Sequence, residues 1–196
     1  MSDMPDARRS QSDFADQSRW NETAKPVLED IRKRPEKYKV RKAPTDRMGI
    51  TAPIATIIGD YQDRELLELG CGRGNHAVYL ANQGARVTGV DIGEDLVAVS
   101  AAVAEANEVQ ARFEQADIRK LPFQRDSFDA AIGLAILHHL PPEGVRQAFA
   151  EAARVLRADG VAIFYEPVEN SPVFDFLQNL IPPGRKGSPF YRPSLL

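Results

Sequence analysis

The sequence is poor in the features that mark several large classes of protein. Cys71 is the only cysteine among 196 residues, which excludes an internal disulfide framework and a multi-cysteine zinc site. No apolar run approaches the ~20 residues of a membrane-spanning helix, and the polar start "MSDMPDARRSQSDF" is not a signal peptide. The net charge of −3 gives no bulk attraction to nucleic acid or to an anionic membrane. We expect a cytoplasmic protein with no metal, no nucleic-acid partner and no membrane span.

What is present divides into four zones. Residues 1–13 are polar and predicted to form a disordered tail. Residues 14–63 have a helical pattern that several prolines interrupt. Residues 64–167 alternate short apolar runs with helical segments, and we assign them to one ligand-binding domain. Residues 168–196 are a partial C-terminal segment.

The alternation after Arg64 predicts an α/β fold. The strands are nearly all apolar, which is typical of a parallel sheet covered by helices on both faces. Right-handed crossovers between them give a Rossmann-like, doubly wound sheet. The expected strands are Glu65–Leu69, Arg86–Val90, Arg112–Ala116, Phe128–Leu134 and Val161–Tyr165, and the expected helices are Asn75–Gln83, Glu94–Ala106 and Gly144–Leu156.

The stretch "ELLELGCGRG" places Gly70, Gly72 and Gly74 between the first strand and the first helix. In a doubly wound sheet this is where the ligand crevice lies, and glycine lets a ligand approach the backbone closely. Free N–H groups at the start of the helix favour a carboxylate or a phosphate. The pattern predicts a nucleotide-type ligand, although a merely tight turn is the alternative.

The spacing does not fit a dinucleotide. In the G-x-G-x-x-G fingerprint the third glycine would stand at residue 75, where this chain has Asn75. Glu68 precedes the first glycine by two residues, and its carboxylate suits a ligand ammonium group better than a pyrophosphate.

Acids also end the next two strands. Asp91 closes the second strand, where a carboxylate can accept both hydroxyls of a ribose. Asp117 follows the third strand, where it can accept from an exocyclic adenine amine. Ile92 and Ile118 beside them offer apolar cover for a purine. Each acid alone can equally be a turn or helix cap. Together with Glu68 they predict a binding site.

Four motifs in order resemble those of class I S-adenosylmethionine-dependent methyltransferases: "ELLELGCGRG", "VTGVDI", "QADIRKLPFQRDSFDAAIGLAILHHL" and "EAARVLRADGVAIFYEP". The similarity covers about half of the chain, from Arg64 to Pro167. It is closest to the small-molecule, type 11-like group that includes the ubiquinone and menaquinone methyltransferases. It implies a strand order of 3-2-1-4-5, S-adenosyl-L-methionine as cofactor and S-adenosyl-L-homocysteine as product.

The resemblance also implies roles for residues. The Gly70–Gly74 loop, with Cys71 as a small loop residue, would cradle the methionine part of the cofactor, and Asp91 would hold the ribose. Asp117 and Ile118 would flank the adenine. The backbone near Leu134 and Ala135 would line the sulfonium end.

Methyl transfer to an oxygen also requires a base. His138 and His139 in "LAILHHL" are the candidates by type and place, and we rank His139 first. The alternative is that the pair only shapes the cofactor pocket. His76 begins a helix and is expected on the surface. The fourth strand lacks the Asn-Pro-Pro-aromatic ending of many amine methyltransferases, which favours O- or C-methylation of a small-molecule acceptor over N-methylation.

The two ends of the chain carry further expectations. In the resembled family the N-terminal zone forms a lid, for which Phe14 and Trp20 are apolar candidates, and the basic cluster within residues 32–42 either favours an acidic acceptor or is a solvated helix end. After Glu166, 30 residues remain, and their tail contains four prolines. Strands six and seven of the full class I fold are therefore expected to be missing, which leaves the edge of strand five for a second copy of the chain to cover.

Two rival functions stay open. One is a cofactor-binding protein that is catalytically incomplete and acts as an interaction partner. The other is an NAD-linked oxidoreductase, which Asn75 and Glu68 disfavour.

Overall fold

The computed structural model of the chain describes residues 24–166. The tail predicted for residues 1–13, the lid candidates Phe14 and Trp20, and the segment 168–196 with the predicted loss of strands six and seven all lie outside the described residues. No helix in the described part of the chain is long and apolar enough to cross a membrane.

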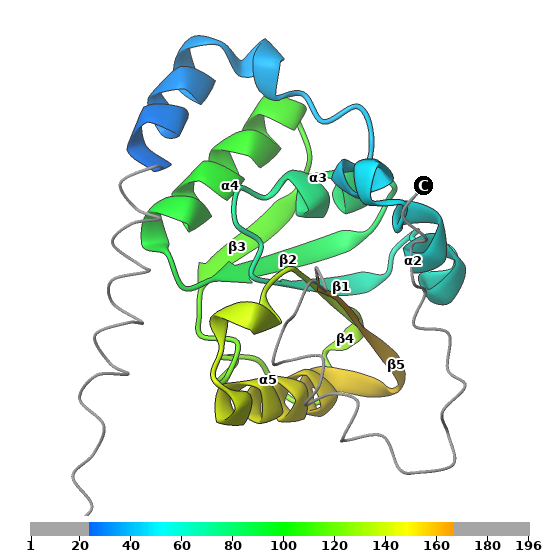
Figure 1. The fold of residues 1–196 in the computed structure, drawn as a ribbon. Coiled ribbons are helices and arrows are strands. Elements are labelled where there is room, and N and C mark those ends of the chain that lie inside the picture. Colours follow the sequence, from blue (N-terminus) through cyan, green and yellow to red (C-terminus); the bar gives the residue numbers. More distant parts are fainter. Residues whose placement is uncertain (1–23, 167–196) are drawn as a thin grey trace, which may run out of the picture.

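Five parallel strands form one sheet in the order β3-β2-β1-β4-β5 (Figure 1). This confirms the predicted doubly wound sheet of order 3-2-1-4-5. The strands are β1 (Glu65–Leu69), β2 (Arg86–Asp91), β3 (Ala111–Gln115), β4 (Phe128–Leu134) and β5 (Leu156–Tyr165). The first four agree with the expected ranges to within one residue.

Strand β5 begins five residues earlier than the sequence indicates. The helix before it ends at Val155, and Leu156 pairs at once with Phe128 of β4. The register then shifts, so that Val161 is the next residue of β5 to pair, with Ala130. The residues 157–160 form the irregularity, and their polar sequence "RADG" hides the strand from an apolar pattern.

Helices cover both faces of the sheet (Figure 1). Helices α2 (Thr51–Ile58), α3 (Asn75–Asn82) and α4 (Glu94–Asn107) lie on one face, and α5 (Pro142–Val155) lies on the other. Alternate residues of β1 follow this division, because Leu66 packs with α2 and α3 whereas Leu67 packs with α5. Short 3-10 helices occur at η1 (Pro35–Tyr38), η2 (Pro44–Met48) and η3 (Leu137–His139).

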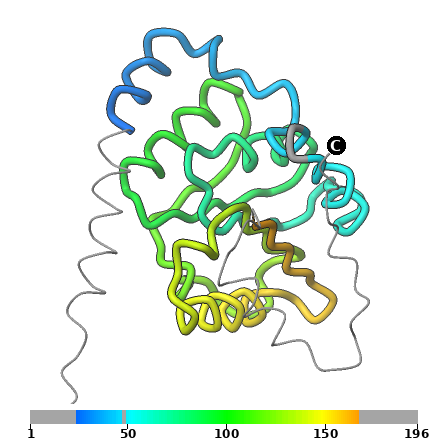
Figure 2. Tube along the Cα trace, in the orientation of Figure 1, coloured from blue at the N-terminus to red at the C-terminus, as the bar shows by residue number. Residues whose placement is uncertain are grey.

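The described part of the N-terminal zone packs along the outer side of α3 and α4, as the trace in Figure 2 shows. Residues 24–33 are helical, and Ala24 and Ile31 are buried against α4. The Asn107 side chain donates to the carbonyl of Tyr38 and accepts from the N–H of Val40. The basic residues within 32–42 are exposed, and Arg34 pairs with Asp30 of the preceding helix.

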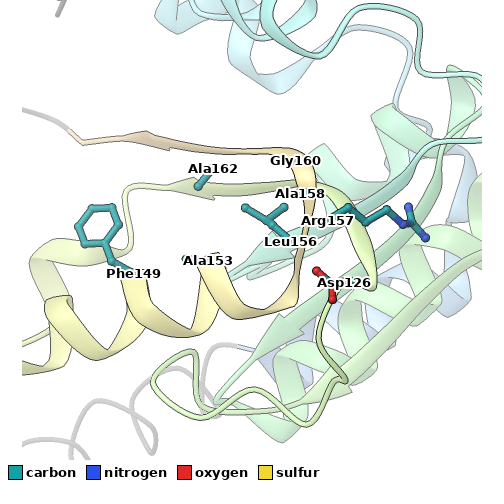
Figure 3. Close-up of a pocket in the computed structure, with 8 residues that line it drawn as sticks. All are labelled: Asp126, Phe149, Ala153, Leu156, Arg157, Ala158, Gly160 and Ala162. Atoms are coloured by element: carbon teal, nitrogen blue, oxygen red, sulfur yellow. The ribbon is translucent and has the colours of Figure 1, made fainter.

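A hollow of about 630 Å³ lies between α5 and the start of β5 (Figure 3). Phe149 and Ala153 of α5 line one wall, and the residues of the β5 irregularity line the other. Among the described strands, β5 pairs only with β4. Most residues that line the hollow belong to the amino-terminal part of β5. They lie away from the carboxyl ends of the strands, which carry the predicted site residues.

Candidate functional site

The site is built on the loop Gly70–Gly74, here called the glycine loop, which joins β1 to α3. The N–H groups of Gly70 and Cys71 both donate to the carbonyl of Val90, at 2.9 Å each. These bonds tie the start of the loop to the end of β2. The loop thus lies at the carboxyl ends of the two central strands, as the doubly wound topology requires for a ligand crevice.

The three glycines of the loop have different surroundings. A Cβ on Gly70 would lie 2.5 Å from Cδ1 of Ile136, and one on Gly74 would lie 2.8 Å from Cβ of Ser100 in α4. A Cβ on Gly72 would meet nothing within 4 Å. All three have positive φ. Two of the glycines are therefore needed for packing within the protein, and only Gly72 faces open space that a ligand can use.

Asp91 joins the glycine loop to the next crossover. Its two carboxylate oxygens accept from the N–H groups of Gly72 and Gly93, each at 2.9 Å. Asp91 as a whole residue is 8% exposed. Each oxygen keeps one further lone pair, so the carboxylate can still accept two ligand hydroxyls. Ser100 fixes the loop from the other side by donating to the carbonyl of Gly72 at 2.9 Å.

Glu68 and His76 form a buried pair beneath the loop. Oε1 of Glu68 lies 3.2 Å from Nδ1 of His76, and both side chains are 5% exposed. The expected surface position of His76 is wrong, because the first turn of α3 packs directly over β1. Oε2 of Glu68 is buried without a hydrogen-bond partner among the described residues. A buried carboxylate oxygen without a donor is costly, so this atom fits a water or a ligand ammonium group as donor.

The Asp117 carboxylate is bound to Arg119. Both of its oxygens accept from Nε of Arg119, at 3.0 and 2.9 Å, and each accepts a further N–H of the same residue. Desolvation by burial raises the pKa of Asp117, but the bonds from Arg119 outweigh it and the pKa lies below its ordinary value. An adenine amine would have to share this carboxylate with the guanidinium, so a bond from Asp117 to adenine stays a prediction.

The remaining predicted cofactor residues fall at the same edge of the sheet. Ile92 is 41% exposed directly after β2, whereas Ile118 is buried in the core with Leu121 and Leu137. Leu134 ends β4, and Ala135 follows it with φ +53. Their roles beside the cofactor stay predictions.

Cys71 is a buried thiol, 3.7 Å from the Ser100 hydroxyl. Burial, followed by the charges of Glu68 and Asp91, raises its pKa well above the ordinary value. This environment suits a small packing residue and opposes a nucleophilic role.

We expect Cys71 to resist alkylation. Because the thiolate is the reacting form and each pKa unit changes its population tenfold, iodoacetamide at pH 8 should modify the native protein at least ~10²-fold more slowly than free glutathione. Mass spectrometry of the labelled protein measures the rate. Labelling in 8 M urea is the control and should proceed at the rate of a free thiol, whereas fast labelling of the native protein would contradict the buried placement.

The two histidines after β4 differ in their partners. Nδ1 of His138 lies 2.8 Å from Oε2 of Glu166, the residue that follows β5. His139 stacks obliquely on His138, with ring centroids 4.1 Å apart. Both side chains are exposed, that of His138 to 37%.

Glu166 and Ser100 are the two contributors that the sequence does not single out. Glu166 occurs in the motif "AIFYEP", but no sequence spacing relates it to His138, 28 residues earlier. The only signal for it is topological, since the ends of the adjacent strands β4 and β5 must meet. Ser100 lies on the buried face of α4. The sequence indicates it only as a polar residue within an otherwise apolar helical pattern.

A doubly wound parallel sheet with a glycine-rich loop after its first strand and a carboxylate at the end of its second is the architecture of a Rossmann-like domain. Comparisons with known proteins narrow this class. Residues 66–160 match the family model of a methyltransferase domain. The chain is 30% identical over 152 residues to the ubiquinone biosynthesis O-methyltransferase of Alkalilimnicola ehrlichii, covering 73% of this chain and 61% of that protein.

Two solved structures share the fold. The YcgJ protein of Bacillus subtilis is 29% identical with a TM-score of 0.57, over 65% of this chain and 55% of that one. The [4+2]-cyclase SpnF is 26% identical with a TM-score of 0.55, over 64% of this chain and 47% of that one. The chain spans less than two thirds of the length of the curated relatives it matches, 44%, 41% and 61% in three of them.

Over residues 66–160 the chain matches a methyltransferase domain, and it shares a Rossmann-like fold with these solved structures.

Proposed function

We propose that this chain binds S-adenosylmethionine between the glycine loop and the end of β2, and transfers its methyl group to an oxygen of a small-molecule acceptor. The observation that carries the proposal is the bond between the Asp91 carboxylate and the N–H of Gly72. It holds a carboxylate that can accept further hydrogen bonds beside the one glycine of the loop at which an added Cβ would meet nothing within 4 Å.

The residues present fit the cofactor. Asp91 would accept the ribose hydroxyls with its remaining lone pairs. The open side of Gly72 would admit the methionine part, and the buried Oε2 of Glu68 would accept from its ammonium group through a water. Ile92, exposed beside Asp91, would cover the adenine. Bound in this way, the cofactor supplies an activated methyl group on a sulfonium.

The chain's own contribution is alignment and proton removal. Holding the acceptor oxygen in line with the methyl carbon can supply on the order of 7–11 kcal/mol by proximity and orientation. A phenolic or alcoholic acceptor must also lose its proton, for which a general base adds about 10²–10⁴-fold. An oxygen acceptor is favoured by the similarity to the ubiquinone biosynthesis O-methyltransferase of Alkalilimnicola ehrlichii.

Cofactor binding is tested by calorimetry with the product S-adenosylhomocysteine and with NADH. We expect tight binding of the first and none of the second. In a dinucleotide site the third glycine packs its helix onto the strand, whereas here Gly74 packs against α4. Binding of NADH in place of S-adenosylhomocysteine would overturn the proposal in favour of an oxidoreductase.

Transfer is tested separately, because one solved relative with this fold is titled a cyclase. The protein is incubated with tritiated S-adenosylmethionine and a cell metabolite extract, and label in the extract is followed by chromatography. A labelled product that has the chemical stability of a methyl ether supports O-methylation. S-adenosylhomocysteine binding without any labelled product would favour a cofactor-binding protein that is not a transferase.

A further inference from the structure

The residues 135–139, here called the β4 turn, lie next to the glycine loop. Ile136 fills the space that the missing side chains of Gly70 and Gly133 leave open, with Cγ2 3.1 Å from an ideal Cβ on Gly133. Ala135 has φ +53, a left-handed conformation that costs about 1–2 kcal/mol for a residue other than glycine. A strained turn of this kind persists only when its surroundings fix it.

Glu166 supplies much of that fixation. Its Oε1 accepts from the backbone N–H groups of Ile136 and Leu137, at 2.8 and 2.7 Å. Its Oε2 lies 2.8 Å from Nδ1 of His138. The Glu166 side chain is only 11% exposed, so these three bonds lie in a largely buried environment. A carboxylate can only accept hydrogen bonds, so the bond between Glu166 and His138 requires the proton to lie on Nδ1 of the ring.

We propose that Glu166 is the positioning residue for His138, and that His138 is the general base of the methyl transfer. Glu166 holds the proton of the neutral ring on Nδ1, which leaves Nε2 as the proton acceptor. Among the described residues Nε2 has no hydrogen-bond partner, and the ring is partly exposed at the edge of the sheet that carries the glycine loop. This inference rests on the proposed function and replaces His139 with His138 as the first candidate.

The step balances with these groups alone. The proton of the acceptor hydroxyl passes to Nε2 of His138, and an oxygen electron pair forms the new bond to the methyl carbon. The bond from that carbon to sulfur breaks, and sulfur keeps the pair as a thioether. His138 ends as an imidazolium whose charge lies next to the Glu166 carboxylate, and it returns its proton to water after product release.

The Glu166→Gln variant separates positioning from folding. A glutamine can still accept the N–H groups of Ile136 and Leu137 through its oxygen, so the β4 turn is kept. Its amide nitrogen can only donate, and Nδ1 of His138 must then accept. The ring is thereby driven to the Nε2–H form, which cannot take a proton at Nε2.

The tautomer is read directly by nitrogen-15 NMR of protein labelled at its three histidines, with His138→Gln used to assign the signal. We expect the Nδ1–H form in the wild type and the Nε2–H form in Glu166→Gln. Turnover, followed with tritiated S-adenosylmethionine and the metabolite extract, should fall by about 10²–10⁴-fold in the variant, the scale of a lost or wrongly protonated base. Affinity for S-adenosylhomocysteine should not change.

Glu143→Gln is the matched control, because it neutralises an exposed glutamate at the start of α5 and should alter neither tautomer nor turnover. An Nε2–H tautomer in the wild type, or full turnover in Glu166→Gln, overturns the role of Glu166. Equal loss of turnover and of S-adenosylhomocysteine affinity overturns it in favour of a purely structural turn. Failure of the wild type to bind S-adenosylhomocysteine overturns the proposed function itself, and calorimetry reveals this independently of the tautomer.

Discussion

Asp91→Ala is expected to weaken the binding of S-adenosylhomocysteine by about 10- to 150-fold, because it removes charge-linked hydrogen bonds worth about 1.5–3 kcal/mol. The carboxylate already accepts from the N–H groups of Gly72 and Gly93, and the ligand would use the lone pairs that remain. Calorimetry of the folded variant measures the loss. An unchanged dissociation constant would remove Asp91 from the site.

Two comparisons distinguish a direct contact of Asp91 with the ligand from an effect of Asp91 on the conformation of the glycine loop. Ser100→Ala removes the bond to the carbonyl of Gly72 but leaves the carboxylate in place, so it should lose far less affinity than Asp91→Ala. The 2′-deoxy analogue of S-adenosylhomocysteine should bind the wild type more weakly than the parent compound. In Asp91→Ala this difference should vanish, because the group that recognises the hydroxyl is gone. A difference that survives in the variant would place the ribose elsewhere.

Four of the five strands follow from local sequence. The apolar runs at Glu65–Leu69 and Phe128–Leu134 each begin after a polar residue, Arg64 and Ser127, and both strands have the expected limits in the structure. The resemblance to a known family then sets the order of strands, which no local pattern contains. Strand β5 shows the limit of this reasoning, because its first residues pair through a register shift that only the partner strand defines.

The sequence predicts where the residues of the candidate site lie along the chain, but it predicts few of the contacts between them. Gly70 and Gly74 have the positive φ that their motif suggests, but their missing side chains make room for Ile136 and Ser100. These contacts are between residues 66 and 26 positions apart, so no local pattern contains them. The same holds for the pairing of Glu68 with His76, since burial of α3 against β1 decides that the histidine is inside.

The different surroundings of the glycines predict the largest change in stability. In Gly74→Ala the new Cβ would lie 2.8 Å from Cβ and 2.9 Å from Cα of Ser100, in a backbone with φ +73. The left-handed conformation costs about 1–2 kcal/mol for alanine, and forcing an extra methyl group into a packed contact costs about 1–3 kcal/mol more. We expect the free energy of unfolding in urea to fall by about 2–5 kcal/mol, a large part of the ~5–15 kcal/mol that a typical domain has.

Gly72→Ala is the matched control for this loss. Its φ of +55 imposes a similar conformational cost, but nothing within 4 Å of the new Cβ opposes it, so its unfolding free energy should fall by only about 1–2 kcal/mol. Its effect should appear instead in calorimetry, as weaker binding of S-adenosylhomocysteine, because the methyl group enters the open side of the glycine loop. Equal destabilisation by the two substitutions would mean that α4 shifts to make room for the new methyl group beside Ser100. Unchanged affinity in Gly72→Ala would mean that the ligand does not approach the loop at this residue.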